Sequence, residues 1–418
     1  MMRNFSNTYD LKSLQDSKTY FLLFIIWPFI AFITALINYN TKEAKRVVYL
    51  FLIYYGLTFV VGNVGNDAER YALSLRQNAE LPFSDFFNII GGLYGSQTTV
   101  DIVQPLISFI VSRFTSHHSL LFASFAALFG FFYLKSINLL YKRYYEKPGL
   151  NALIHLAFFA MILPIMAING FRMWTAAWIF FFGAYHVILY RNPVYFILTL
   201  SSCLVHYSFL SVNAVLIIYY FAGNRNIVYL PLAVLSFILP NLLMPFFQSI
   251  FGSLGGALKA RAEMYANDDV ILARQESFED LAWFMKIGND LVLYYLLFGI
   301  IFIQVLHKDS MKDQPEKNLF SFLLLFLAFV NFGKVIPSFG GRFQVIFFMF
   351  ATLFIFLYLV KLPGRKINLL TLVGLFPMLL YAAIAFRQGA DSINAWILTP
   401  GIGLPLLAPL SLAEVMFY

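Results

Sequence analysis

The stretch FQVIFFMFATLFIFLYLV, at residues 343–360, is apolar along nearly its whole length and contains no charged residue. An apolar run of this length is long enough for a helix to cross the hydrocarbon core of a bilayer. Similar runs recur along the chain between short polar breaks, without the alternation of apolar and polar residues that marks membrane β-strands. Because a segment inside lipid must satisfy its own backbone hydrogen bonds, these runs predict membrane-spanning helices.

The composition of the 418-residue chain supports the same class. Apolar residues make up 60% of it and charged residues 12%, whereas soluble domains carry about a quarter charged residues. This composition excludes a soluble enzyme and intrinsic disorder, and the single cysteine, Cys203, excludes a disulfide scaffold. The net charge of +8 comes from Lys and Arg spread along the chain without a basic block, so we expect no nucleic-acid partner.

We therefore predict an all-α polytopic membrane protein with about twelve spans in a single membrane domain, residues 1–418. The first apolar run is long enough to span and lacks a small-residue cleavage pattern after it, so it should remain in the mature protein. The predicted spans are 20–38, 47–64, 118–135, 151–168, 173–190, 194–205, 208–221, 227–247, 286–306, 318–333, 343–360 and 367–385.

The segment 194–221 decides which loops share a side of the membrane. It fits either one long helix or two short helices that meet at His206 and Tyr207. Two helices concentrate Lys and Arg in short segments on one side, which the positive-inside rule assigns to the cytoplasm, so we predict the hairpin. The segments then predicted inside are 39–46, 135–150, 191–193, 222–226, 307–317 and 361–366.

The external side of this topology carries most of the acidic residues, so we look for the functional site there. It includes the loop 65–117 with an interfacial helix, the large loop 248–285 as a candidate lid, and the C-terminal segment 386–418. The apolar stretches 102–113 and 393–410 are too short to cross and should lie in the interface or dip into the bundle.

Two arginines begin spans on the external side, Arg172 in NGFRMW and Arg342 in SFGGRFQV. A cation at a helix end can simply extend to the lipid headgroups. Alternatively, a guanidinium beside a tight corner offers paired donors to a phosphate or pyrophosphate. Two arginines of the same form on one side make the anion site as well supported as the simpler interpretation.

Directly after the second predicted span, the sequence gathers Asp67, Glu69, Arg70 and Tyr71. Asp67 and Arg70 are spaced to pair on one helix face, which would neutralise both charges. The alternative is a carboxylate base held by a neighbouring arginine, with Tyr71 as a stacking platform for a sugar ring.

Further candidates are His206, at the bend of the predicted hairpin, and residues of the two long loops. His206 is either a satisfied core group or, because polar groups at membrane depth are costly and its pKa is ordinarily near neutral, a general base. Asp101, in TTVDIVQP, is interpreted mainly as a helix cap. Arg261 and Tyr265 belong either to a solvated helix face or to a lid that contacts substrate.

Motifs of other classes are missing. The chain has no HExxH, no Cys/His cluster, no phosphate-binding Gly-rich loop and no GxSxG, so metalloprotease, ATP-driven pump and hydrolase are unsupported. No acidic residue lies deep inside a predicted span, Asp290 being the nearest, which disfavours an ion-coupled transporter. We expect neither a cofactor nor a metal.

Three stretches resemble the EpsG/Wzy-type polysaccharide polymerases of bacterial envelopes. NVGNDAERY, 63–71, is similar to that family's Asn-Val-Gly-x-Asp-x-x-x-Tyr after the second span. Residues 169–210 resemble its central Arg-led helix, basic loop and His-x-Ser bend, and GGRFQVIFF, 340–348, resembles its late Arg-led span. The chain departs from the pattern at Val61, where the family often has Arg, and at Gln104, where a Glu often precedes the proline.

The resemblance implies a function and a place. Such polymerases sit in the bacterial cytoplasmic membrane as GT-C-like helical bundles and act on its external side. They transfer a growing glycan from undecaprenyl pyrophosphate to the sugar end of another lipid-linked repeat unit, and chain-length regulator and flippase proteins are expected partners. Our interpretation of the residues is compatible with this function. Glu69, Asp67 and His206 are the candidates for the base, and the candidates for pyrophosphate or glycan contacts are Arg172, Arg342, Arg387, Arg70, Tyr71, Arg261 and Tyr265.

Two other functions remain open. A flippase for lipid-linked oligosaccharides should line a cavity accessible from both sides with its charges. An O-antigen ligase-like transferase shares the chemistry and differs in its acceptor. A purely structural scaffold is the least favoured, because it gives no reason for two arginines at span starts on one side.

Overall fold

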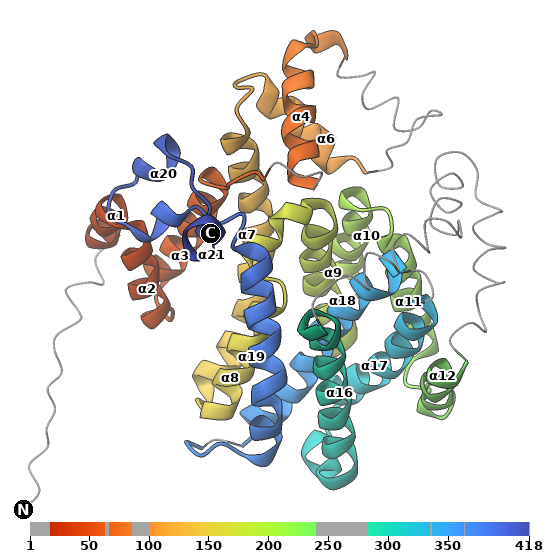
Figure 1. The fold of residues 1–418 in the computed structure, drawn as a ribbon. Helices are drawn as coiled ribbons and strands as arrows, with labels where there is room; N and C mark the ends of the chain where they lie inside the picture. Colours follow the sequence, from red (N-terminus) through yellow and green to blue (C-terminus); the bar gives the residue numbers. More distant parts are fainter. Residues whose placement is uncertain are drawn as a thin grey trace, which may run out of the picture.

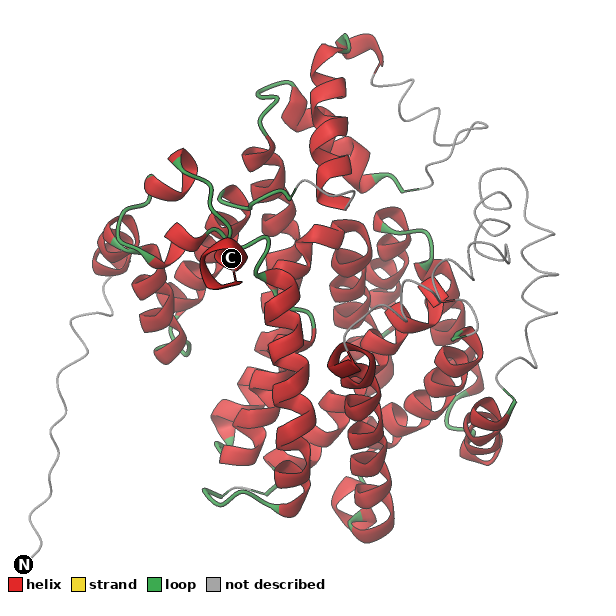
Figure 2. Cartoon of the chain, in the orientation of Figure 1, coloured by secondary structure: helices red, strands yellow, loops and turns green. Residues whose placement is uncertain are grey.

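The computed structural model describes residues 17–62, 67–85, 101–239, 283–334, 337–362 and 364–417. Within these ranges the chain is helical and contains no strand (Figures 1 and 2). A single isolated antiparallel bridge in these ranges joins Asn394 to Ser411. The all-α prediction is therefore confirmed.

Six helical segments of the described chain are long and apolar enough to cross a membrane, which indicates a multi-pass membrane protein. The prediction of about twelve spans exceeds these six. The run Leu150–Tyr190 contains two of the predicted spans, and the remaining predicted spans are short helices or extend outside the described residues. The six are α7 (His118–Glu146), the run Leu150–Tyr190, α16 (Trp283–Leu306), α17 (Gln314–Gly333), the Gly340–Val360 part of α18 (Pro337–Val360), and α19 (Leu369–Gly389).

Prolines divide two of the apolar runs. The predicted span 20–38 is wrong as one helix: it consists of α1 (Ser17–Ile26) and α2 (Pro28–Ile37), because Pro28 has no N–H to continue the first helix. The run Leu150–Tyr190 breaks in the same way near Pro164. There it forms α8 (Leu150–Ile162), the 3-10 turn η3 (Ile165–Gly170) and α9 (Phe171–Tyr190).

The helices α10 (Phe196–Val205) and α11 (Phe209–Ala222) form the predicted hairpin. Asn213 of α11 donates a hydrogen bond to the backbone oxygen of Thr199 in α10, at 2.9 Å. Arg191, before α10, donates to the backbone oxygen of Tyr220, near the end of α11, at 2.6 Å. The two helices are therefore antiparallel and meet at the bend that contains His206. The helix α12 (Asn226–Ile238) follows them.

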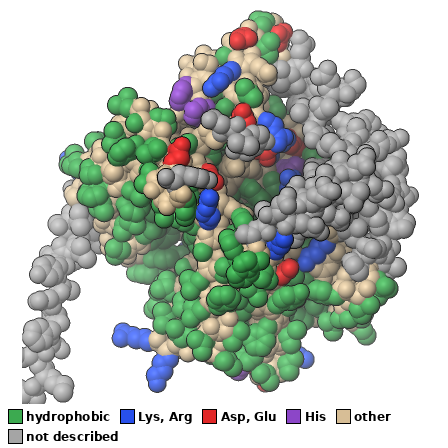
Figure 3. All heavy atoms as spheres, viewed as in Figure 1, with side chains coloured by type: hydrophobic (Ala, Val, Ile, Leu, Met, Phe, Trp, Pro, Cys, Tyr) green, Lys and Arg blue, Asp and Glu red, His purple; other side chains and the backbone are tan. Residues whose placement is uncertain are grey.

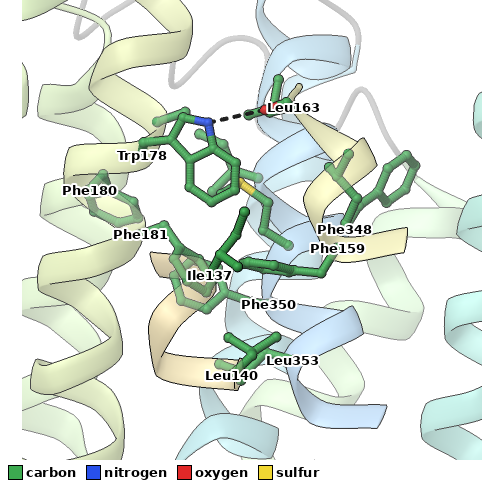
Figure 4. Close-up of a cluster of buried hydrophobic side chains, with 14 of the residues drawn as sticks. Ile137, Leu140, Phe159, Leu163, Trp178, Phe180, Phe181, Phe348, Phe350 and Leu353 are labelled. Carbon is green, nitrogen blue, oxygen red and sulfur yellow. Dashed lines mark hydrogen bonds between the residues drawn. The ribbon is translucent and has the colours of Figure 1, made fainter. Parts of the chain in front are cut away.

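The helix α18 lies at the centre of the bundle, in contact with α7, α8, α9, α16 and α17. Almost all of its side chains over 343–360 are buried, as expected of a helix that is apolar on every side. Figure 4 shows Phe350 of α18 in one cluster with Phe159 of α8 and Trp178 of α9. The Trp178 indole donates to the backbone oxygen of Leu163 at 3.3 Å, which ties α9 to the end of α8.

The C-terminal segment packs against the first helices. After α19 it forms η7 (Ala395–Leu398), α20 (Leu404–Leu407) and α21 (Leu412–Phe417). The Trp27 indole, at the break between α1 and α2, donates to the backbone oxygen of Leu398 at 2.9 Å. Tyr54 of α3 (Lys42–Leu57) donates to the backbone oxygen of Ile402 at 3.0 Å. The two ends of the described chain thus form one side of the bundle (Figure 1).

The loops predicted to lie inside gather at one end of the bundle. The backbone N–H of Leu150 donates to the oxygen of Gly364 at 3.0 Å, and Lys361 donates to the backbone oxygen of Ser310 at 2.7 Å. These bonds connect three of the segments that the Lys and Arg distribution assigns to the cytoplasm. Which side of a membrane this end faces stays a prediction.

Candidate functional site

A cavity of about 560 Å³ lies at the other end of the bundle, where α4 (Asp67–Glu80), η3, α16, α18 and α19 converge. Each of these five elements belongs to, or directly adjoins, a segment predicted to be external. On the face drawn in Figure 3, acidic and histidine side chains gather mostly in the upper half, above a lower half covered mainly by hydrophobic side chains. The polar side chains of the lining include Asp67, Asn169, Asn289, Arg342 and Gln388.

Beside this cavity, the guanidinium of Arg172 is held by a buried carboxylate. Arg172 lies in the first turn of α9, between the lining residues Gly170 and Trp174. Its Nη1 donates to Oδ2 of Asp101 at 3.0 Å, and its Nε donates to the Tyr71 hydroxyl at 3.3 Å. The Asp101 side chain is only 3% exposed, so this ion pair is shielded from water on the carboxylate side.

The second oxygen of Asp101 faces the bend of the α10–α11 hairpin. Oδ1 accepts a hydrogen bond from the backbone N–H of Tyr207 at 2.8 Å. Nδ1 of His206 lies 3.6 Å from the same oxygen, a contact slightly longer than a hydrogen bond. One carboxylate therefore joins the start of α9 to the hairpin bend. We call Asp101, Arg172, His206 and Tyr71 the Asp101 cluster.

The charges of the Asp101 cluster keep its carboxylate ionised. Burial by itself would raise the pKa of Asp101, but His206 and Arg172 beside it together hold that pKa below its usual range. Burial also raises the pKa of the Tyr71 phenol, so Tyr71 stays neutral near pH 7. The cluster is thus a fixed ion pair with a neutral phenol against the guanidinium.

Local sequence explains how these side chains reach one place. Asp67 and Tyr71 are one helical turn apart on α4, so both face the bundle. Tyr71 packs edge-on against Phe125 of α7, with ring centroids 5.5 Å apart, and Phe125 stacks on Phe171 at the start of α9 at 3.9 Å. This aromatic row fixes α4 next to Arg172.

The segment that carries Asp101 is tied to α10. The backbone N–H of Ile102 donates to the oxygen of Leu204 at 2.9 Å, which places Asp101 next to the hairpin bend. The interpretation of Asp101 as a helix cap is wrong. The helix that follows, α6 (Val103–Ser112), has Ile102 at its N-cap position and no side-chain cap, because both carboxylate oxygens are bonded elsewhere.

Arg342 has different surroundings from Arg172. It lines the cavity at the start of the buried part of α18, and within the described part of the chain it forms no ion pair. A side chain at Gly340, near the start of α18, would come within 2.3 Å of the backbone of Lys334 at the end of α17, so a glycine is required for this close approach. Two residues later, Arg342 lines the cavity as a cation without an ion-pair partner among the described residues.

The remaining predicted site residues divide among several places. Asp67 lines the cavity and also pairs with the exposed Arg70 at 3.5 Å, as its spacing predicts. Glu69 is not among the residues that line the cavity. Arg387 pairs with Asp391 at 3.5 Å, beside the lining residues Gln388 and Gly389.

Two predicted contacts, Arg261 and Tyr265, lie outside the described residues, as does nearly all of the candidate lid 248–285. Among the residues that the structure describes, no group of three or more His, Cys, Asp or Glu side chains is placed to hold a metal ion. Metal-independent chemistry stays a prediction.

Comparison with known proteins agrees with the sequence motifs. The model of the EpsG family matches residues 46–397, a range that includes the Asp101 cluster and every residue that lines the cavity. No curated protein and no solved structure matches the chain. The family resemblance drawn from the motifs is confirmed. This chain belongs to the EpsG family, and it is a polysaccharide polymerase-like membrane protein.

Proposed function

We propose that the protein polymerises lipid-linked oligosaccharide repeat units. In this proposal it transfers the growing glycan from undecaprenyl pyrophosphate to the sugar end of another lipid-linked unit, on the external side of a bacterial cytoplasmic membrane. The observation that carries the proposal is the cavity of about 560 Å³ with the cation of Arg342 and the carboxylate of Asp67 in its lining.

Arg342 is the proposed ligand of the pyrophosphate. It has no competing carboxylate in the described ranges, whereas Arg172 is already paired with Asp101. A guanidinium has five N–H donors, so Arg172 retains donors for a second contact after it bonds Asp101 and Tyr71. Fixed cations at this point stabilise the negative charge that develops on the leaving pyrophosphate.

The transfer itself needs one base. The acceptor hydroxyl oxygen attacks the anomeric carbon of the growing chain, and the bond from that carbon to the pyrophosphate oxygen breaks. The electron pair leaves with undecaprenyl pyrophosphate, and the hydroxyl proton passes to a base. We propose Asp67 for this role, because it is in the cavity lining, while His206 is packed against Asp101 and only 6% exposed.

The apolar part of the cavity suits the lipid carrier. Besides its charged groups, the lining includes Ile162, Leu163, Met166, Val345 and Ile384. We propose that the isoprenyl units next to the pyrophosphate pack against these side chains, since apolar surface favours burial against apolar surface.

The arrangement favours a transferase over a flippase. A flippase should connect both sides of the membrane through one polar path, whereas the described residues around α18 form a core of buried apolar side chains, some of which Figure 4 draws. Phe348, Phe350 and Leu353 of that core are fully buried. A ligase would use the same site with another acceptor.

The glycans of cells that lack the protein provide the test. Complementation by wild type should restore a ladder of surface chains, and Arg342→Ala should leave a single capped repeat unit. The matched control is Arg365→Ala, an exposed arginine at the opposite end of the bundle, which should restore the ladder. Long chains with Arg342→Ala contradict the proposed site. In cells that lack the protein, failure of even the single repeat unit to reach the surface indicates a flippase. Long chains that stay on the lipid carrier in those cells indicate a ligase.

A further inference from the structure

A second cavity, of about 610 Å³, lies at the opposite end of the bundle from the proposed transfer site. It is formed where α16 ends, where the 3-10 turn η6 (Lys308–Met311) follows, and where α12 and α17 begin. Its lining includes Lys308, Lys312, Lys317 and the polar side chains of Asn224 and Gln304. The transfer chemistry does not use any of these groups.

The charge of this lysine cavity is positive overall. Lys312 pairs with Asp309, also in the lining, at 2.8 Å. Lys308 and Lys317 form no ion pair within the ranges that the structure describes. Two ammonium groups therefore remain to attract an anion into the same cavity.

One wall of the lysine cavity is fixed before any ligand arrives. Asn224 accepts a hydrogen bond from the Tyr219 hydroxyl at 2.9 Å and donates to the side chain of Asn318 at 2.9 Å. Gln314 donates to the same oxygen of Asn318 at 2.8 Å. The next lining residue, Asn226, begins α12, whose N-cap position carries no side-chain cap, so the positive end of the helix dipole adds to the lysines.

Apolar side chains around the lysine cavity indicate where the rest of a ligand would lie. Ile227, next to the lining residue Asn226, is 87% exposed. Val305, next to the lining residue Gln304, is 72% exposed, and Leu306 is exposed as well. In a membrane protein such side chains face acyl chains. A lipid could therefore place its headgroup in the cavity and its acyl chains against the exposed side chains of α12 and α16.

We propose that the lysine cavity binds the phosphate of an anionic phospholipid headgroup. Clustered lysines next to a membrane segment attract anionic lipids, each contributing about fivefold to binding near the surface. The lysines belong to the segment 307–317, which the positive-inside pattern assigns to the cytoplasm, the side where anionic lipids act on such clusters. Free phosphate shares the charge but lacks contacts to the exposed apolar side chains, so the lipid is the favoured source.

The test measures thermal unfolding of the purified full chain in neutral detergent with added lipid. Phosphatidylglycerol should raise the Tm, because a ligand that binds only the folded state stabilises it, and phosphatidylcholine should raise it less. The triple variant Lys308→Gln, Lys312→Gln, Lys317→Gln should need at least about fivefold more phosphatidylglycerol for the same shift. The control, Lys142→Gln, Lys147→Gln, Lys366→Gln, removes equal charge from exposed lysines outside the cavity and should respond as wild type.

The outcomes separate the alternatives. An equal Tm shift with phosphatidylglycerol in the triple variant and in wild type overturns the proposal. A control variant whose Tm shift is reduced as much as that of the triple variant also overturns it, because that result would indicate general attraction of the lipid to positive charge. A full Tm shift with inorganic phosphate alone overturns the lipid as the source. Should the triple variant fold poorly, the single change Lys317→Gln replaces it, and native mass spectrometry measures the lipid bound to wild type. If wild type shows no preference for phosphatidylglycerol over phosphatidylcholine in that measurement, the proposal is overturned.

Discussion

The starts of α9 and α18 are alike in sequence and different in electrostatics. Each has glycine shortly before an arginine that leads a long apolar helix. In α9, Arg172 donates to a buried carboxylate and a phenol, so its positive charge is neutralised within the protein. In α18, Arg342 faces a cavity and forms no ion pair within the described residues. An arginine at the start of a span can therefore organise a site or bind its ligand.

The different surroundings of the two arginines indicate different roles. The pair of Arg172 and Asp101 connects α9, α4 and the α10–α11 hairpin, and so fixes the geometry on one side of the cavity. Arg342 contributes a charge that only a ligand would neutralise. Loss of the first should harm folding and function together, whereas loss of the second should harm function alone.

The largest effect on stability should come from Asp101→Ala. This change leaves the guanidinium of Arg172 and the N–H of Tyr207 without their carboxylate, and breaking a buried ion pair costs about 3 kcal/mol or more. Thermal unfolding of the purified chain in detergent measures the loss. Arg342→Ala serves as the comparison and should unfold within a few degrees of wild type. Equal destabilisation by both variants would remove the distinction between the two arginines.

The next effect is on activity, at Arg342. If Arg342 stabilises the leaving pyrophosphate, Arg342→Ala should slow polymerisation about 100-fold to 1,000-fold, as removal of one charge-stabilising donor does in other enzymes. Arg342→Lys keeps the charge but not the paired donors, and it should recover part of the rate. The readout is the rate of chain growth from a lipid-linked repeat unit in reconstituted vesicles. Unchanged rates with Arg342→Ala, at wild-type Tm, would assign the pyrophosphate to another group.

A smaller effect is expected at Tyr71. Tyr71→Phe removes the hydroxyl that accepts from Arg172 but keeps the ring against Phe125, so the unfolding free energy should fall by about 1 kcal/mol. Tyr145→Phe, near the other end, is the matched control: its exposed hydroxyl accepts a long hydrogen bond from Asn40, at 3.5 Å, so its loss should have a much smaller effect. A loss with Tyr71→Phe as large as with Asp101→Ala would place the phenol, not the carboxylate, at the centre of the cluster.

The smallest effect concerns pH. The pKa of Asp101 is lowered in the folded protein, so its contribution to stability is complete above the usual carboxyl pKa of about 4. It is lost as the pH falls through the lower folded value. The Tm difference between wild type and Asp101→Asn should therefore be constant from pH 8 to pH 5 and narrow in more acidic buffers. A difference that narrows already between pH 8 and pH 6 would mean that a group other than Asp101 controls the stability of the cluster.

Much of this molecule was open to prediction from local sequence. Apolar run length predicts the helices, and the two short runs around His206 predict the hairpin that the hydrogen bonds of Asn213 and Arg191 confirm. The positive-inside pattern groups the loops that the structure finds together at one end. A single continuous helix over 20–38 is wrong, because a proline at residue 28 ends a helix even when hydropathy continues.

The class of protein, the family and the two span-leading arginines can all be inferred from the amino-acid sequence alone. These depend on apolar run length, charge pattern and short motifs, which are local properties of the chain. In contrast, no local pattern shows that Asp101, 71 residues from Arg172, is its partner or that Arg342 faces a cavity, and both depend on the folded arrangement. Ion pairing depends on which helix ends meet and how much water they exclude, and long-range packing sets both.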